Sequence, residues 1–374
     1  MKLRRVLPHK LRRKLRRMLY GQVIDLASGD PDYQPPPRAL KAAIKALKEG
    51  VRYTDPNGLL ELREKIAETI EKEHKAIYDP KSEIIITYGA SEALYLTFNL
   101  FLKGATALIP SPHYPQYREQ IAQAGGQIAT YPFDNSTPIE EVAANIKRKL
   151  TRNVKLIIIN SPHNPTGRVL NKGEVEALAE IAQEGDALIV WDEVYSKIIF
   201  EGRHHTLAEI PEAASKTIFI GSFSKTYGMT GWRVGYIYGP QEITSKISSL
   251  HRAITFSSNP STQIAALEAL KDEQYLEKIL RELRKRREAL IRGLKDIEAL
   301  ELHPPQGSLF AFPRLARSKF SDKEFAELLL KEGVKVDPGY KYHGEKHIRI
   351  SFARASQRDL TKASMIIKDI LRRN

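Results

Sequence analysis

The chain contains no cysteine and no long apolar run. The absence of cysteine excludes disulfide bonds and thiolate metal sites, so catalytic chemistry has to come from lysine, tyrosine, aspartate, asparagine, serine or arginine. No segment approaches the roughly 18 apolar residues that a membrane-spanning helix needs. With 42% hydrophobic and 28% charged residues among 374, the composition is that of a globular protein. We therefore expect a cytoplasmic protein that does not bind membranes.

Acidic residues are missing from the first 20 positions, which carry nine lysines and arginines. The formal net charge of the whole chain is +14, so the remainder is only mildly basic. Three interpretations of this arm stay open: a solvated or subunit-docking tail, a segment attracted to nucleic acid or another acidic surface, and an organelle presequence. Because the excess charge is concentrated in the arm, we expect no nucleic-acid partner.

Beyond the arm, apolar β-branched runs alternate with helical patterns, the order typical of an α/β protein. The runs are continuous rather than alternating, which favours a mostly parallel sheet flanked by helices on both faces. The predicted strands are 83–88, 105–109, 154–160, 187–191, 217–220 and 234–238, and the predicted helices are 37–49, 59–75, 91–101, 117–124 and 172–183.

The pattern changes after Pro260. An amphipathic helix predicted over 272–297 carries eight arginines and lysines, and shorter strand candidates follow at 309–313 and 348–352. These features predict a smaller α+β domain after the large one. The expected division is a basic arm and substrate-side segment (1–35), a large domain (36–280) and a small C-terminal domain (281–374).

Open parallel sheets bind ligands at the carboxyl ends of their strands, so the residues after each predicted strand are the first candidates. After 217–220, Lys225 is preceded by Ser222 and Ser224 and followed eight residues later by Arg233. Hydroxyls and an arginine suit a phosphate, which arginine can bind with two hydrogen bonds. A partly desolvated lysine near other cations has a lowered pKa and can attack a carbonyl. The pattern therefore favours a lysine next to a phosphate-bearing aldehyde.

The segment 222–235, SFSKTYGMTGWRVG, resembles the pyridoxal 5′-phosphate (PLP) attachment signature of class I/II aminotransferases, the fold-type I family typified by aspartate aminotransferase. The hydroxyls, the lysine, the small residues, the arginine and the final glycine all match. The resemblance extends from about residue 24 to the end of the chain. It implies that Lys225 forms a Schiff base with PLP, that Ser222, Ser224 and Arg233 bind the cofactor, and that the large domain is the PLP-binding one.

Polar residues after other strands match further positions of the family. The resemblance assigns Asn164 and Tyr195 hydrogen bonds to the phenolic O3′ of the cofactor, and Asp192 a pairing with its pyridine nitrogen. A buried carboxylate in that position keeps the ring protonated and makes it an electron sink. His163, beside Asn164, is interpreted as a turn residue.

Two more loops supply cofactor contacts in the family. Ala90 and Ser91 open a helix after 83–88, where free N–H groups and the positive dipole end suit an anion, and the resemblance places their backbone on the phosphate. Ser91 is also interpreted as an N-cap. After 105–109, Tyr114 matches the aromatic ring that lies flat against the pyridine, whereas Tyr117 stays open between the site and packing.

The resemblance also implies contacts to substrate and to a second subunit. The Gly29 backbone would lie near the substrate carboxylate, and Arg349 matches the arginine that clamps this carboxylate, together with Asn164. Tyr53 matches a tyrosine that reaches the phosphate of the neighbouring subunit, which implies a homodimer with shared active sites. We expect no metal.

Together these residues predict a PLP-dependent aminotransferase that moves an amino group between an L-amino acid and a 2-oxo acid. Lys225 would act as the general base that shuttles the proton. We expect aspartate-type or broad specificity with 2-oxoglutarate as acceptor. The substrate stays open, because no single basic residue marks a site for a second carboxylate: Lys341, His343 and Arg38 are interpreted as exposed loop residues.

Two other functions are compatible with parts of the pattern. A PLP-dependent C–S lyase or decarboxylase on the same scaffold keeps the same cofactor residues, so the motifs do not separate these enzymes from an aminotransferase. A PLP-domain transcription regulator carries a separate DNA-binding domain before the PLP fold. The roughly 25 residues before Leu26 are too few for such a domain, which makes this interpretation remote.

Overall fold

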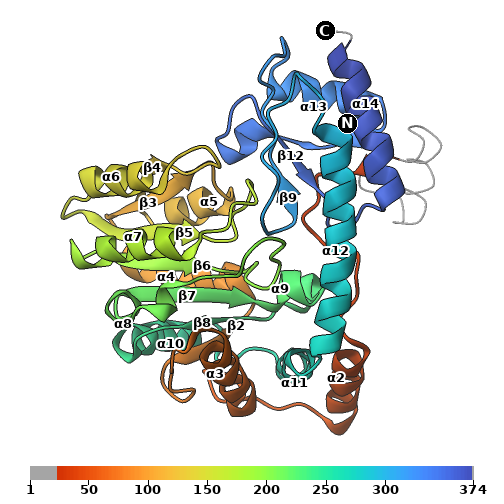
Figure 1. Cartoon of the computed structure of the whole chain (residues 1–374). Coiled ribbons are helices and arrows are strands. Elements are labelled where there is room, and N and C mark those ends of the chain that lie inside the picture. Colours follow the sequence, from red (N-terminus) through yellow and green to blue (C-terminus); the bar gives the residue numbers. More distant parts are fainter. Residues whose placement is uncertain (1–22, 373–374) are drawn as a thin grey trace, which may run out of the picture.

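The computed structural model describes residues 23–372, so the basic arm lies outside the described residues. A seven-stranded sheet forms the centre of the larger part (Figure 1). Its order is β2-β8-β7-β6-β5-β3-β4, and only β8 runs antiparallel to its neighbours. The strands are β2 (Ile84–Thr87), β3 (Thr106–Ser111), β4 (Gln127–Pro132), β5 (Val154–Asn160), β6 (Leu188–Asp192), β7 (Thr217–Ser222) and β8 (Gly235–Tyr238).

Helices cover both faces of this sheet. The core on one face includes residues of α3 (Leu60–His74), α6 (Ile139–Lys149), α7 (Lys172–Gln183) and α8 (Pro211–Ala214). The core on the other face includes residues of α4 (Ala90–Phe101), α5 (Gln116–Gln123) and α10 (Gln241–Thr255). In β5, Ile157 and Ile159 enter the first core, and Leu156 and Ile158 enter the second. Successive side chains of a strand point to opposite faces, so a strand buried on both faces needs an uninterrupted apolar run.

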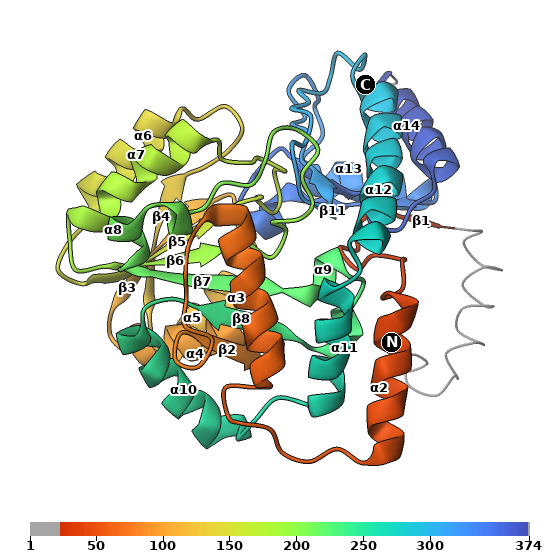
Figure 2. The ribbon, with the colours of Figure 1, turned by 60° about the horizontal axis from the view of Figure 1, so that its bottom comes forward.

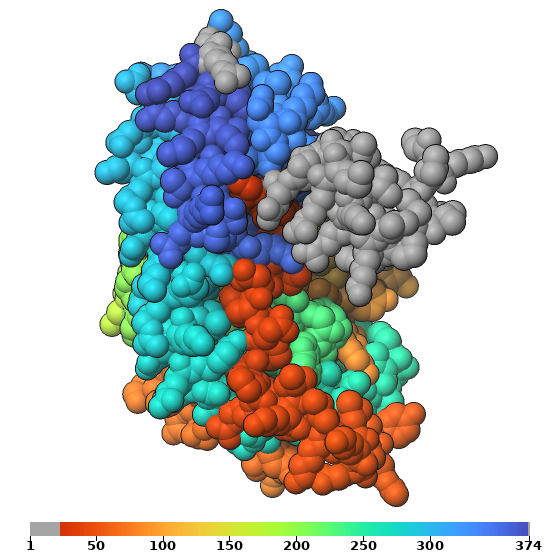
Figure 3. All heavy atoms as spheres, turned by 90° about the vertical axis from the view of Figure 1, so that its right-hand side faces the viewer, coloured from red at the N-terminus to blue at the C-terminus, as the bar shows by residue number. Residues whose placement is uncertain are grey.

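A smaller sheet lies in a separate hydrophobic core at the top of Figure 1. It consists of β11 (Asp337–Pro338), β12 (Ile348–Ser351) and β9 (Phe310–Ala311), all antiparallel, while β1 (Ile24–Asp25) pairs with β10 (Val334–Lys335). The helix α12 (Glu273–Leu294) lies beside α14 (Gln357–Arg372), as Figure 3 shows, and α13 (Asp322–Lys331) completes this core. β1 and β10 form a separate two-stranded sheet, and Ile24 of β1 belongs to the same core although it lies far from these residues in the sequence.

Two further helices, α2 (Pro37–Glu49) and α11 (Pro260–Leu270), pack against each other, and α11 also contacts α3 (Figure 2). The remaining short helices are η2 (Leu207–Glu209), α9 (Phe223–Thr226), η3 (Thr230–Trp232) and η4 (Gly339–Tyr342). No helix within residues 23–372 is long and apolar enough to cross a membrane.

The predicted fold class, a large mostly parallel α/β part with a smaller α+β part, is confirmed. The exact domain boundaries at residues 36 and 281 stay a prediction. Two details of the sequence interpretation were wrong. The run 234–238 was expected to be a parallel strand but forms the antiparallel β8, and β4 was not predicted at all. β4 is the last strand of the sheet, and its half-exposed residues give no continuous apolar run.

Candidate active site

A cavity of about 540 Å³ lies where the carboxyl ends of several strands of the large sheet face the small sheet. The ends of β5, β6 and β7 contribute Asn160, Asp192 and Ser222, and the small sheet side contributes Phe310 and Arg349. Twelve of the thirteen site residues predicted from the sequence line this one cavity: Gly29, Ala90, Ser91, Tyr114, Asn164, Asp192, Tyr195, Ser222, Ser224, Lys225, Arg233 and Arg349.

Lys225 lies on α9, the short helix that follows β7. Ser222 begins this helix, because its Oγ accepts a hydrogen bond from the N–H of Ser224 at 3.1 Å. The Nζ of Lys225 donates to the carbonyl of Gly29 at 3.1 Å. Burial lowers the pKa of Lys225 to about 8, with smaller contributions from the charges of Arg349 and Arg233. A large fraction of this amine is therefore neutral and nucleophilic near pH 8.

Asp192 ends β6 and is only 4% exposed. Its Oδ2 accepts a short hydrogen bond from the hydroxyl of Tyr117, and its Oδ1 accepts one from the N–H of Val194 at 3.3 Å. Burial raises the pKa of Asp192 to about 6, although both hydrogen bonds act in the opposite direction. The carboxylate thus lacks a cationic partner among the described residues, and a cationic group entering the cavity would stabilise its charge.

Asn164 and Tyr195 lie beside this carboxylate in the cavity wall. The backbone N–H of Asn164 is fixed by Asn160 Oδ1 at 2.9 Å, and its own Oδ1 accepts from Arg349 Nη1 at 3.2 Å. The ring of Tyr195 contacts Phe310 edge to face. Burial raises the pKa of Tyr195 well above its ordinary value, so its hydroxyl keeps its proton and can donate a hydrogen bond.

The start of α4 and Arg233 form an anion-binding corner. The N-cap of α4 is Gly89, with φ of +78° and no side-chain cap, so the interpretation of Ser91 as N-cap was wrong. A side chain at Gly89 would clash, because its Cβ would lie 2.5 Å from Arg233 Nη2. The first N–H groups of a helix have no carbonyl partner within that helix, so those of Ala90 and Ser91 suit an anion.

Arg349, on β12, forms the opposite end of the cavity. Its guanidinium lies 4.1 Å from the ring centre of Phe310 and 4.5 Å from that of Tyr342. Its Nη2 donates to the carbonyl of Ala27 at 2.6 Å and to Asp337 Oδ2 at 3.0 Å. Its Nε is buried without a hydrogen-bond partner among the described residues. A buried unpaired N–H is costly, which suits a site that a carboxylate completes.

Tyr53 is the one predicted site residue that the cavity does not include. Its side chain is 82% exposed, and its ring contacts Phe256 at 5.0 Å between centroids. Within one chain, then, Tyr53 makes no contribution to this site.

Several contacts at the site were not assigned from the sequence. Tyr117, which the sequence left open between the site and packing, bonds to Asp192, and Asp337 pairs with Arg349. Lys341, His343 and Arg38 do not line the cavity. They bind elsewhere: Lys341 pairs with Asp337, His343 stacks on His113, and Arg38, which begins α2 rather than a loop, pairs with Glu268. His163 is a buried turn residue, as expected.

The residues present fit PLP. Two positions of the cavity suit anions: the unpaired Nε of Arg349 and the backbone at Gly89, which has no side chain. Between them lie Lys225, whose pKa is lowered, and the buried carboxylate of Asp192. The phosphate of PLP suits the backbone at Gly89, its aldehyde suits Lys225 and its basic ring nitrogen suits Asp192. A substrate carboxylate suits Arg349. Among the described residues, no group of histidine or acidic side chains could hold a metal ion.

Comparison with known proteins agrees with this geometry. The family described as aminotransferase class I and II matches residues 21–367. Aspartate aminotransferase of Pyrococcus abyssi is 35% identical over 359 residues, which cover 94% of this chain and 92% of that protein. Aromatic-amino-acid aminotransferase 2 of Thermococcus litoralis is 34% identical and covers 90% of this chain and 88% of its own length.

A solved structure is also similar to most of the chain. The crystal structure of aromatic aminotransferase from Pyrococcus horikoshii superposes with a TM-score of 0.88 at 34% sequence identity, covering 94% of this chain and 96% of that one. The family match includes the predicted lysine, carboxylate and arginine segments. The protein therefore belongs to the class I and II aminotransferase family and is an aminotransferase.

Proposed function

We propose that this aminotransferase binds PLP in the 540 Å³ cavity and attaches it covalently to Lys225. The observation that carries the proposal is the convergence of twelve predicted site residues, from strand-end loops and from the small sheet, on this single cavity. Ala90, Ser91 and Arg233 would bind the phosphate, Tyr114 would lie against the ring, and Asn164 with Tyr195 would bond to the phenolic oxygen.

The remaining residues divide the chemistry between them. When bound, the cofactor supplies an electron sink for the carbanion formed at the substrate Cα. Asp192 holds a proton on the ring nitrogen, and its burial makes this pairing strong. Arg349 and Asn164 bind the substrate α-carboxylate, next to the backbone of Gly29. Lys225 Nζ removes the proton from Cα and returns one later, which its lowered pKa permits near neutral pH.

For the substrates, we propose an L-amino acid donor of aspartate type or broad specificity and 2-oxoglutarate as acceptor. Relatives named for aspartate and for aromatic amino acids match this chain almost equally, at 35% and 34% identity. The described cavity walls contain three basic residues, Lys225, Arg233 and Arg349, and each has a role in the proposed chemistry. A second substrate carboxylate would therefore need a cation from elsewhere, such as the neighbouring subunit.

A panel of amino donors tests this function. The purified protein is reconstituted with PLP and mixed with one amino acid at a time, without acceptor, and the change in cofactor absorbance is followed. An aminotransferase performs one half-reaction and stops until 2-oxoglutarate is added. Steady production of pyruvate, sulfide or carbon dioxide from the amino acid alone would contradict the proposal, because a lyase or decarboxylase turns over without an acceptor.

We further propose a homodimer in which Tyr53 serves the site of the neighbouring subunit. Tyr53 is 82% exposed, and Phe256, Ile254 and Val51 also expose 43%, 50% and 41% of their surface. Closed two-fold dimers are the commonest soluble oligomers, and burial of such apolar residues favours them. Tyr53→Phe is expected to weaken PLP retention modestly, since a hydrogen bond to a charged group contributes about 1.5–3 kcal/mol.

Complementation tests the shared sites directly. Inactive Lys225→Ala protein is mixed with inactive Tyr53→Asp protein under conditions that exchange subunits. In the heterodimer, one site carries both lesions and the other carries neither, so activity should reappear. No recovery despite proven exchange, or a fully active monomer, would contradict shared sites.

A further inference from the structure

A second buried carboxylate follows Asp192 directly. Glu193 is 5% exposed, nearly as buried as Asp192 at 4%. The alternation along β6 separates the two side chains: Ile189 and Trp191 enter the core on the α3 face, whereas Val190 enters the core on the α4 face. Glu193 continues the first series and Asp192 the second. Glu193 therefore faces away from the cavity, and the mechanism proposed above does not use it.

Two side chains from different elements fix the carboxylate of Glu193. Tyr238 of β8 donates its hydroxyl to Oε1 at 2.6 Å, and His204 Nε2 lies 3.0 Å from Oε2. The backbone N–H of Glu193 donates to the carbonyl of Ile220 on β7 at 3.0 Å. Each of these partners is itself buried. The residue thus has three anchors at the point where β6 turns into the loop that carries Tyr195.

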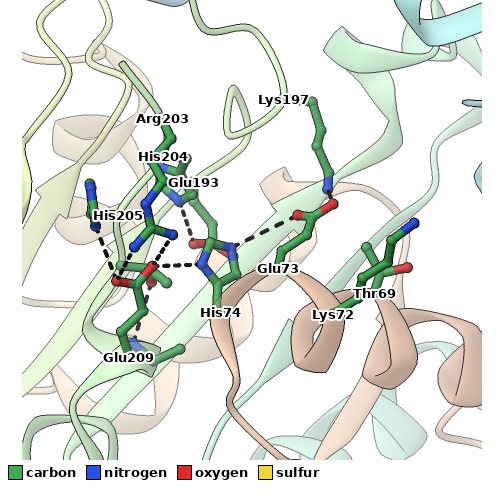
Figure 4. A network of polar contacts seen from close by, with 12 residues as sticks. Thr69, Lys72, Glu73, His74, Glu193, Lys197, Arg203, His204, His205 and Glu209 are labelled. Carbon is green, nitrogen blue, oxygen red and sulfur yellow. Dashed lines mark hydrogen bonds and ion pairs between the residues drawn. The ribbon is translucent and has the colours of Figure 1, made fainter.

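The contacts continue from Glu193 to the protein surface (Figure 4). The ring of His204 meets that of His74 on α3 edge to face at 5.6 Å between centroids. His74 Nδ1 lies 2.9 Å from Glu209 Oε1. His205 and Arg203 contact the same carboxylate of Glu209 at 3.1 and 3.3 Å. This cluster joins the loop after β6 to α3.

A small cavity of about 30 Å³ places the cluster behind the active site. Its walls include His74 and Glu73 of α3, Glu193 of the β6 turn, and Phe223 and Thr226 of α9. Lys225 lies on this same α9, between Phe223 and Thr226. Sequence neighbours of both proposed catalytic groups, Asp192 and Lys225, therefore line this cavity.

The charge on Glu193 is compensated locally. Burial alone would raise the pKa of Glu193, but the hydrogen bond and charge of His204, the charge of His74 and the hydrogen bond from Tyr238 together lower it. The other titratable groups that feel this charge are Asp192, Tyr78 and Tyr236. An ionised, fully bonded carboxylate resists displacement, because any movement breaks buried hydrogen bonds.

We propose that Glu193 is a positioning residue for transamination: anchored by His204 and Tyr238, it fixes the turn that directs Asp192 and Tyr195 into the active-site cavity. The inference rests on the proposed PLP-dependent function. It predicts that cofactor protonation and reaction rate depend on a side chain that touches neither cofactor nor substrate.

Paired substitutions at Glu193 test the proposal in the PLP-loaded protein. Glu193→Gln retains oxygen and nitrogen atoms for both hydrogen bonds, whereas Glu193→Ala removes them. We expect Glu193→Ala to slow the single-turnover half-reaction about 10- to 100-fold with KM close to native, since small misplacements of catalytic groups cost this much. The pH midpoint of the bound cofactor's visible absorbance should also shift by about one unit. Glu193→Gln should restore most of the rate and the native midpoint.

Glu73→Gln is the matched control: Glu73 borders the same 30 Å³ cavity and lies 3.9 Å from His74, but it makes no hydrogen bond to Glu193 or to its anchors His204 and Tyr238. It should leave rate and midpoint unchanged. A Glu193→Ala protein that melts earlier but keeps the native midpoint and rate would overturn the proposal, since a merely structural residue behaves this way. Native protein without a cofactor band would instead contradict the PLP-dependent function itself.

If Glu193→Ala does not fold, Tyr238→Phe provides a second test of the proposal, because this substitution removes only one hydroxyl group. We expect a smaller change of the same kind, a roughly threefold slower half-reaction with a shifted midpoint, because Glu193 keeps its contact with His204 and loses one hydrogen bond. A native rate and midpoint in Tyr238→Phe would overturn the proposal.

Discussion

At the end of β6, two neighbouring acids lie on opposite faces of the large sheet, and their pKa values shift in opposite directions. Asp192 and Glu193 are consecutive and equally buried, yet the pKa of Asp192 rises to about 6 and that of Glu193 falls. On the cavity face, the carboxylate of Asp192 accepts hydrogen bonds from Tyr117 and Val194. On the α3 face, the hydrogen bonds of Glu193 with His204 and Tyr238 lower its pKa despite its burial.

Two lysines show the same contrast. Lys225, on the cavity face, donates to the carbonyl of Gly29, and burial lowers its pKa to about 8. Lys197, on the α3 face, has a full ion pair with Glu73. On the α3 face, Glu193 and Lys197 have polar or charged partners among residues 23–372, whereas on the cavity face Asp192 lacks a cationic partner and Arg349 Nε lacks a hydrogen-bond partner among the same residues. This difference supports the proposed position of the active site without reference to any relative.

Substitution of the two lysines should produce the largest difference. Lys225→Ala removes the proposed nucleophile and base, and we expect the half-reaction to slow by at least about 10²–10⁴-fold. Lys197→Ala breaks only a partly exposed ion pair, which contributes about 0–1 kcal/mol, so its rate should stay close to native. Stopped-flow absorbance after mixing with the best donor measures both. A similar loss of rate in the two variants would contradict the proposed difference between the cavity face and the α3 face.

Asp192 is expected to give the next largest effect. Asp192→Asn should leave PLP bound but slow transamination about 10²–10³-fold, because the ring nitrogen loses the charge that keeps it protonated. Retained cofactor absorbance together with the half-reaction rate measures this outcome. A near-native rate would show that Asp192 does not contact the ring nitrogen.

The stability of the cofactor-free protein should distinguish the two acids by the sign of their pH dependence. The pKa of Asp192 is raised in the folded state from 3.8 to about 6, so its contribution to stability is full below pH 3.8 and is lost as the pH rises through 6. Asp192→Asn cannot ionise and should therefore gain about 3 kcal/mol relative to native protein across this window.

Glu193→Gln should show the opposite trend, because the pKa of Glu193 is lowered on folding and its charge stabilises the folded state above its ordinary pKa. Melting temperatures of native, Asp192→Asn and Glu193→Gln apo-protein between about pH 3 and pH 7.5 provide the measurement, because the Glu193 contribution changes below the ordinary glutamate pKa and the Asp192 contribution changes above the ordinary aspartate pKa. Parallel curves for the two variants would contradict the opposite environments of these acids.

Sequence reasoning succeeded for the fold where burial is uniform. The strand 154–160 was predicted at its observed bounds, because β5 is covered on both faces and has to be apolar throughout. The direction of a strand cannot be predicted in this way, because an antiparallel strand buried on both faces needs the same continuous apolar run as a parallel strand. For that reason β8 was predicted as parallel.

At the site, the sequence predicted residues that lie at or just after the ends of strands. It did not predict the residues that bond to them from other parts of the chain. Lys225 and Asp192 were found because they follow apolar runs and match family positions. Asp337 and His204 act through Arg349 and Glu193 and lie 12 and 11 positions from those partners. No local sequence pattern predicts such pairs. Asp337 and Arg349 become neighbours only when β11 pairs with β12, and His204 reaches Glu193 only when the loop after β6 folds back.

The covalent attachment of PLP tests the central claim most directly. PLP-loaded protein is reduced with borohydride, digested and mapped by mass spectrometry. The account predicts that the visible absorbance band disappears and that the reduced cofactor is found on Lys225, with no label on Lys197. Label on a different lysine, or a protein that retains no cofactor, would contradict the assignment of this cavity as the active site.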